Sequence, residues 1–151
     1  MAIPVRRSNS DPVVIQVAPL INGEPFPTLF WLVDSELNYR IDHLEARGVI
    51  AQLQTRIDND RALQIALAVE HRQYIALRQQ LMTAAQRQLL QKKGFLSVLA
   101  KRGIGGIANF GHIRCLHTHY AAHLVHPNTV GKLTDGYLAE AAEWAIHTAP
   151  S

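Results

Sequence analysis

The side chains best suited to binding a metal are crowded into one short stretch, GHIRCLHTHYAAHLVHPN, residues 111–128. It holds the only cysteine of the chain and five of its eight histidines. Thiolate and imidazole are the side-chain ligands that zinc and similar ions prefer. We expect a helix over about 112–126, ended by Pro127 because proline disfavours helical geometry in the residue before it. At about 100° per residue, one face of this helix would carry five of these side chains within roughly 80°: His112, Cys115, His119, His123 and His126. His117 would lie on the opposite face.

This stripe predicts a site for zinc or another transition metal. Two ligands four residues apart on a helix can bind one ion. Cys115 and His119 fit that spacing and are the expected core ligands, with His123 or His117 completing the site. The five residues of the stripe would not all share one ion, because Cys115 and His123 would lie about 12 Å apart along the helix axis. Ligands from elsewhere in the chain are then needed, and the candidates are Asp34, Glu45, Glu70 and His71. The competing interpretation is that the imidazoles fill a core, with their hydrogen bonds satisfied there.

A glycine-rich segment, KRGIGGIANFG, precedes the predicted Cys/His helix. Free backbone N–H groups at a helix N-terminus favour an anion. We expect Gly105, Gly106, Arg114 and Asn128 to line such a site, with a small phosphorylated or carboxylated ligand. The spacing matches neither a Walker loop nor a dinucleotide fingerprint. A flexible connector is the alternative.

The remaining elements must position these side chains. Two β-rich runs, Val13–Val17 and Thr28–Val33, lie on either side of Asn22-Gly23, a dipeptide suited to a tight turn. The fold class we expect is α+β, mainly α, with an N-terminal β-ribbon packed on a helical bundle. Its parts are a flexible arm at 1–12 and a single domain at 13–151, which comprises a ribbon at 13–33, helices at about 35–93, a glycine-rich loop at 94–111, the Cys/His helix at 112–126 and a last helix at about 131–147. Within the helical region, Asp34 or Ser35 caps the first helix, and Asn59 or Asp60 starts a long helix at 59–92.

Composition narrows the class of protein. The chain has 151 residues, 48% hydrophobic and 18% charged, with a net charge of +3, which is typical of a globular domain. Lys and Arg are too dispersed for a typical nucleic-acid binder, so nucleic acid is an unlikely partner. A single cysteine excludes an internal disulfide. The chain has neither the roughly 20 apolar residues of a membrane span nor the apolar region of a signal peptide, which favours a cytoplasmic location.

Several blocks of the sequence resemble a known family. They are PFPTLFWLV at 25–33, LEARGVI at 44–50, IRCLHTHYAAHL at 113–124 and NTVG at 128–131. Together they resemble the uncharacterised bacterial proteins known as domain of unknown function 501. The resemblance implies no established activity, although some members carry a label for septum formation. It points to Arg114, Cys115, Leu116, His117, Asn128 and Gly131. Relatives that carry cysteines before the PFPTL-type block differ from this chain, which has none there.

Three functional hypotheses follow. The first is a metal-binding protein or metal-dependent enzyme that acts on a small anionic substrate. The second is covalent catalysis without metal, with Cys115 and His117 as the catalytic candidates, since a nearby histidine activates a thiol. The third is a non-enzymatic adaptor, related to cell division by the family label. It would bind a protein partner through the helix at 59–92, with a polar face that includes Arg72, Gln79 and Arg87, or through the exposed edge of the β-ribbon.

Overall fold

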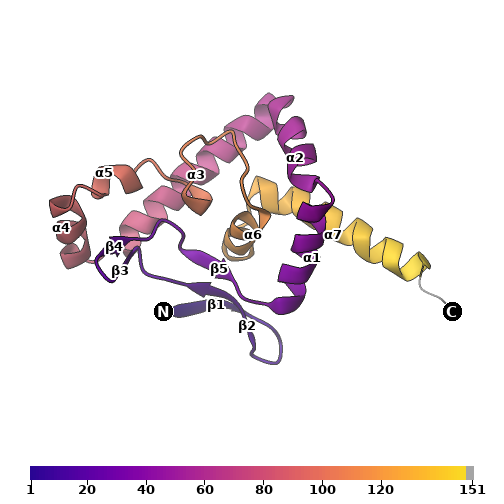
Figure 1. Cartoon of the computed structure of the whole chain (residues 1–151), viewed down its shortest axis with the longest axis horizontal. Helices are drawn as coiled ribbons and strands as arrows, with labels where there is room; N and C mark the ends of the chain where they lie inside the picture. The colour runs from indigo at the N-terminus through magenta and orange to yellow at the C-terminus, as the bar shows by residue number, and fades with distance from the viewer. Residues whose placement is uncertain (149–151) are drawn as a thin grey trace.

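The computed structural model describes residues 1–148, with the side chains of 1–142 (Figure 1). The fold is α+β and mainly α, as the sequence predicts. In chain order the elements are β1 Ala2–Arg6, β2 Pro12–Gln16, β3 Leu20–Ile21, β4 Glu24–Pro25, β5 Phe30–Leu32, α1 Ser35–Ala46, α2 Val49–Asp58, α3 Arg61–Leu81, α4 Ala84–Lys92, α5 Leu96–Leu99, the 3-10 turn η1 Ile104–Gly106, α6 Leu116–Val125 and α7 Thr129–Thr148.

The N-terminal strands form an antiparallel sheet in the order β1-β2-β5. The predicted ribbon is present, with Ile15 opposite Trp31. The prediction of a flexible arm at 1–12 is wrong for its first part, because β1 pairs with β2 and places Val5 opposite Val14. Ile3 and Val5 are half-buried and alternate with exposed residues, which is the pattern of an edge strand with one packed face.

Asn22 and Gly23 do form the predicted tight turn, within a small hairpin of their own. β3 and β4 pair there, with Ile21 opposite Glu24. Both turn residues have positive φ, 51° and 78°, as a two-residue turn of type I′ requires. The turn therefore lies inside the connection between β2 and β5, and those two strands do not share a tight turn.

Local capping signals set the helix boundaries. The Asp34 side chain accepts a hydrogen bond from the backbone of Leu37 and caps α1. Arg7 binds the same carboxylate, and this contact lowers the pKa of Asp34 to about 2. Asp60 caps α3 in the same way. Because an oxygen acceptor is needed where the first backbone N–H groups of a helix lack partners, the sequence limits each helix start to two neighbouring residues, Asp34 or Ser35 for α1 and Asn59 or Asp60 for α3.

The predicted helix at 59–92 is in fact two helices. α3 ends at Leu81, Met82 is extended, and α4 starts after Thr83. Thr83 and Gln86 form a reciprocal capping box, in which each side chain bonds the other residue's backbone N–H. This arrangement stabilises a new helix start. The polar face expected on one long helix is therefore divided between two elements.

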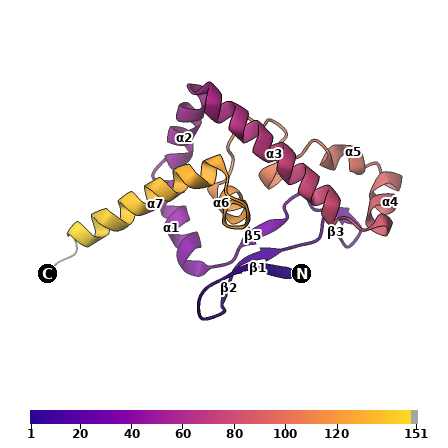
Figure 2. The ribbon, with the colours of Figure 1, turned by 180° about the vertical axis from the view of Figure 1, so that it is seen from behind.

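α6 lies at the centre of the molecule, between the sheet and α1, α3 and α7 (Figures 1 and 2). Leu116 and Tyr120 pack in the core formed by the helices. Ala121 and Ala122 pack in a second core against the sheet, beside Phe30. A helix with such opposite apolar faces is buried almost all round.

Within the described residues, no helix is long and apolar enough to cross a membrane.

The region predicted as a glycine-rich loop at 94–111 contains α5 and η1, and a buried arginine fastens it to α3. Arg78 is 1% exposed. Its guanidinium donates to the carbonyl oxygens of Pro27 (2.7 and 2.9 Å), Leu99 (2.9 Å) and Gly103 (3.3 Å). One side chain thus joins α3 to both the segment before β5 and the glycine-rich segment.

We expect Arg78→Met to lower the free energy of unfolding by about 2–4 kcal/mol, since buried carbonyls left without a donor cost about 1–3 kcal/mol each. Urea denaturation followed by circular dichroism measures this. Arg87→Met is the matched control, because Arg87 is exposed and its side chain bonds only the carbonyl of Gln79 among the described residues. It should change stability by less than about 0.5 kcal/mol. Equal effects of the two substitutions would contradict this role of Arg78.

Candidate metal centre

The Cys/His segment is not one helix from 112 to 126. α6 begins at Leu116, and Cys115 is extended, with φ −148° and ψ 124°. The first free backbone N–H of the helix, that of Leu116, donates to the carboxylate of Glu45 on α1 at 2.9 Å. Because the helix begins only there, His112 does not continue its face, and the predicted five-residue stripe does not form. His112 lies exposed in the preceding segment.

Three potential ligands converge at this helix start. The Sγ atom of Cys115 lies 3.7 Å from Nδ1 of His117. Oε1 of Glu45 lies 3.4 Å from the same nitrogen. One ligand atom from each of the three side chains falls within 4.8 Å of the others. We call this the Glu45–Cys115–His117 cluster, and it is half-buried.

The other ring nitrogen of His117 has its own partner. Nε2 lies 2.8 Å from Oδ1 of Asp42, one helical turn before Glu45 on α1. A carboxylate beside Nε2 favours the proton on that nitrogen. The lone pair of a neutral His117 is then on Nδ1, directed toward Cys115 and Glu45.

His119 lies elsewhere, in the core against His71 of α3. Both are fully buried, with ring centroids 5.7 Å apart in an edge-to-face arrangement. Nδ1 of His71 accepts from the backbone of Ile104. Nε2 of His71 and both nitrogens of His119 have no partner among the described residues. Burial lowers the pKa of His71 to about 4, and burial together with the neighbouring His71 lowers that of His119 to about 3.

The side chain of His123 links α6 to α7 through polar contacts of both its ring nitrogens. Its Nε2 lies 2.7 Å from Asp135, and its Nδ1 accepts from the backbone of Asn128. Tyr120 donates to the other oxygen of Asp135. The carboxylate thus binds two side chains of α6. Of the predicted metal ligands, the structure therefore brings Cys115 and His117 together and places His119 and His123 in separate surroundings.

The residues predicted to bind an anion occupy different parts of the fold. Both amide atoms of Asn128 are used, Nδ2 toward the carbonyl of His119 and Oδ1 toward the N–H of Gly131. Gly105 and Gly106 have positive φ in η1, at 66° and 76°. Arg114 is exposed just before α6. The side chain of Asn128 therefore links α6 to α7 through these two hydrogen bonds.

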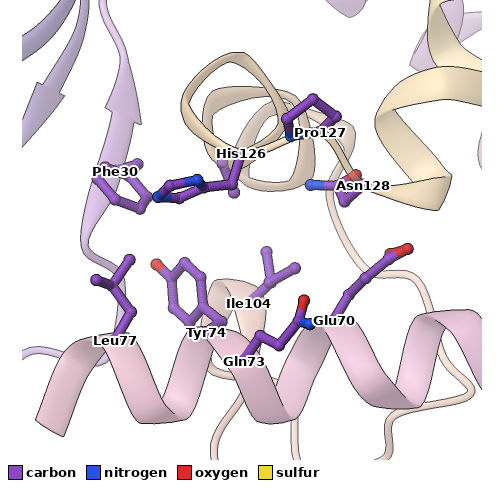
Figure 3. A pocket seen from close by; sticks show the side chains of 10 residues that line it. Phe30, Glu70, Gln73, Tyr74, Leu77, Ile104, His126, Pro127 and Asn128 are labelled. Carbon is purple, nitrogen blue, oxygen red and sulfur yellow. The ribbon is translucent and has the colours of Figure 1, made fainter. Parts of the chain in front are cut away.

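A hollow of about 350 Å³ lies between α3 and the C-terminal end of α6 (Figure 3). His126, Pro127 and Asn128 face Leu77, Tyr74, Gln73 and Glu70 across it. Glu70 also accepts hydrogen bonds from the backbone and hydroxyl of Thr129 and so holds the start of α7. The Glu45–Cys115–His117 cluster does not line this hollow. The cluster and the hollow are separate features.

The sequence alone does not point to Asp42 as a partner of His117. It offers Glu45 only as one of four possible further metal ligands. A signal was available, because these two acidic residues are three apart and so share one face of α1. Nothing in the sequence places that face beside Cys115, some 70 residues later.

Comparison with known proteins supports the resemblance read from the sequence. A family model described as protein of unknown function (DUF501) matches residues 3–135. No curated protein and no solved structure matches the chain.

Proposed function

Because the chain belongs to the DUF501 family, whose function is unknown, we propose its function from the geometry, as a metal-binding protein that holds a zinc-like ion at the Glu45–Cys115–His117 cluster. One observation carries the proposal. In a tetrahedral zinc site with Zn–S near 2.3 Å and Zn–N and Zn–O near 2.0 Å, the S···N separation is about 3.5 Å and the N···O separation about 3.3 Å. The corresponding separations here are 3.7 and 3.4 Å. Two of the three separations are thus close to those expected for ligands of one ion, and the third, between Cys115 and Glu45, is within 4.8 Å.

Asp42 strengthens this proposal. A histidine that binds a metal usually donates its other N–H to a carboxylate, which fixes the ring and makes it a better ligand. Asp42 lies 2.8 Å from Nε2 of His117, on the side away from Cys115 and Glu45. The proposed ligand is therefore already oriented.

The chemical role follows from the number of ligands. Three protein ligands leave a fourth position for water or substrate, as in catalytic zinc sites. His117 and Glu45 are 23% and 25% exposed, so solvent reaches the cluster. A water molecule bound to such an ion can act as a nucleophile near neutral pH, which suits hydrolysis. An ion here would also join α1 to the start of α6.

A second candidate function rests on the same histidine. His117 lies between the thiol of Cys115 and the carboxylate of Asp42, in the order nucleophile, base and orienting acid that covalent hydrolases use. Cys115 also directly precedes the first residue of α6 and is partly exposed. In this alternative no metal is needed, and Cys115 attacks the substrate directly.

Metal analysis tests the first proposal. Protein purified without a nickel column and then equilibrated with zinc should carry about one ion per chain, and Cys115→Ser or His117→Ala should weaken binding at least tenfold, since each removes a ligand. His112→Ala is the matched control, because this histidine is exposed and three residues before Cys115. Metal content below about 0.2 per chain, unchanged by Cys115→Ser, would contradict the metal site.

Alkylation by iodoacetamide separates the two candidates. If Cys115 is a metal ligand, zinc should protect it and a chelator should restore its reaction, because a coordinated thiolate is a poor nucleophile. If Cys115 is a free nucleophile, zinc and chelator should change nothing, and His117→Ala should slow the reaction. The two patterns exclude each other.

A further inference from the structure

The outer face of α3 carries an uncovered row of residues at alternating spacings of three and four. All five are exposed: Ala62, Ile65, Val69, Arg72 and Ala76. We call this row the α3 seam. Ile65 and Val69 are among the large apolar side chains that are most exposed, at 55% and 41%. Figure 2 shows α3 on the near side of the molecule, with no other element drawn in front of it.

The spacing is that of a helix-pairing surface. Apolar residues alternating three and four apart occupy the a and d positions at which one helix packs its side chains between those of another. Two β-branched residues and two alanines fill four of the five positions here, and such small or stiff side chains allow close approach. An isolated exposed apolar residue needs no explanation, but two neighbours in a regular row favour a partner.

The charge along one side of the seam indicates what kind of partner fits. Two shallow hollows flank the seam. The first is lined by Arg61, Ile65, Val69 and Arg72 among others, and the second by Arg72, Ile75 and Lys101 among others. Among the described residues, no carboxylate lines either hollow. No ion pair with a described side chain is formed by Arg61, Arg72 or Lys101.

We propose that the α3 seam docks an amphipathic helix of another protein, with apolar residues on its contacting face and acidic residues along its flank. Ile65 and Val69 provide the apolar contact. Arg72, at a seam position, and Lys101, on the adjoining segment, bind the acidic flank. Such flanking charges select partner and orientation more than they add affinity. The proposal is independent of the metal site, because none of its residues belongs to the Glu45–Cys115–His117 cluster.

Two synthetic helical peptides test it against the full chain. Both have about four heptads with leucine at a and d, and the flanking positions carry glutamate in one and lysine in the other. Fluorescence anisotropy at low salt should show the glutamate peptide binding at least tenfold more tightly. Arg72→Glu should weaken that binding at least tenfold, and Ile65→Ser with Val69→Ser should abolish it. Val98→Ser is the control, since Val98 is 46% exposed and lines neither hollow.

Three results would overturn the proposal. The two peptides could bind equally, which would show no selection by charge. Arg72→Glu could leave binding of the glutamate peptide unchanged. Sedimentation could show that the chain forms dimers that Ile65→Ser dissociates, in which case a second copy occupies the seam. Circular dichroism of each variant confirms that it is folded.

Discussion

Lowering the pH from 7 to 5 is expected to reduce the free energy of unfolding by about 4 kcal/mol because of two buried histidines, His71 and His119. Their pKa values in the folded protein are about 4 and about 3. In the unfolded chain a histidine titrates near 6.5. Between about pH 4 and 6.5 the unfolded state therefore binds more protons than the folded state, and stability falls as the pH falls. The loss levels off once the pH is below both folded values.

His119→Leu isolates this effect. Neither ring nitrogen of His119 has a hydrogen-bond partner among the described residues, so an apolar side chain of similar size should change stability at pH 7 by only about 1 kcal/mol. The fall between pH 7 and 5 should then shrink to about half, because one of the two groups no longer titrates. Urea denaturation at a series of pH values measures both quantities.

His112→Ala is the control, because His112 is exposed. In this variant the free energy of unfolding should depend on pH as it does in the unmodified chain. If His119→Leu leaves the dependence on pH as steep as before, the acid sensitivity has another origin.

Gly131→Ala is expected to lower the free energy of unfolding by about 3 kcal/mol or more. A Cβ atom at this position would lie 2.0 Å from Cγ and 2.2 Å from Cβ of His123. His123 cannot turn away cheaply, because one ring nitrogen accepts from the backbone of Asn128 and the other contacts Asp135. The start of α7 would have to move away from α6, at the cost of those bonds.

Gly136→Ala on the same helix is the matched control. A Cβ atom there meets nothing within 4 Å, and alanine favours a helix over glycine by about 1 kcal/mol. This variant should be as stable as the parent chain or more so. Thermal unfolding followed by circular dichroism compares the two, and similar midpoints would show that the packing of α6 against α7 tolerates a methyl group.

The packing of Gly131 against His123 also indicates what the segment NTVG at 128–131 does in the fold. Asn128 bonds the carbonyl of His119 and the N–H of Gly131. Thr129 bonds Glu70 on α3. Each of these residues joins α7 to an element packed against it. The block therefore has a structural role at the α6–α7 joint, whereas Cys115 and His117 of the preceding block belong to the proposed metal site.

The sequence by itself determined the features that depend on neighbouring residues. The start of α1 was limited to Asp34 or Ser35, the start of α3 to Asn59 or Asp60, and Asn22-Gly23 was identified as a turn, because an acceptor oxygen or a positive φ acts within three or four residues. The fold class was readable for the same reason, since a helix or strand shows its own periodicity. The Cys/His segment was also found in this way, by composition alone.

Only the tertiary structure decided which of those side chains meet. The start of α6 depends on Glu45, supplied by a helix far earlier in the chain. That start separates His119, sealed in the core against His71, from Cys115 and His117. The burial of Arg78 likewise depends on carbonyl groups of two distant segments. Convergence and burial are set by how separate elements pack, and local sequence spacing carries no record of that packing.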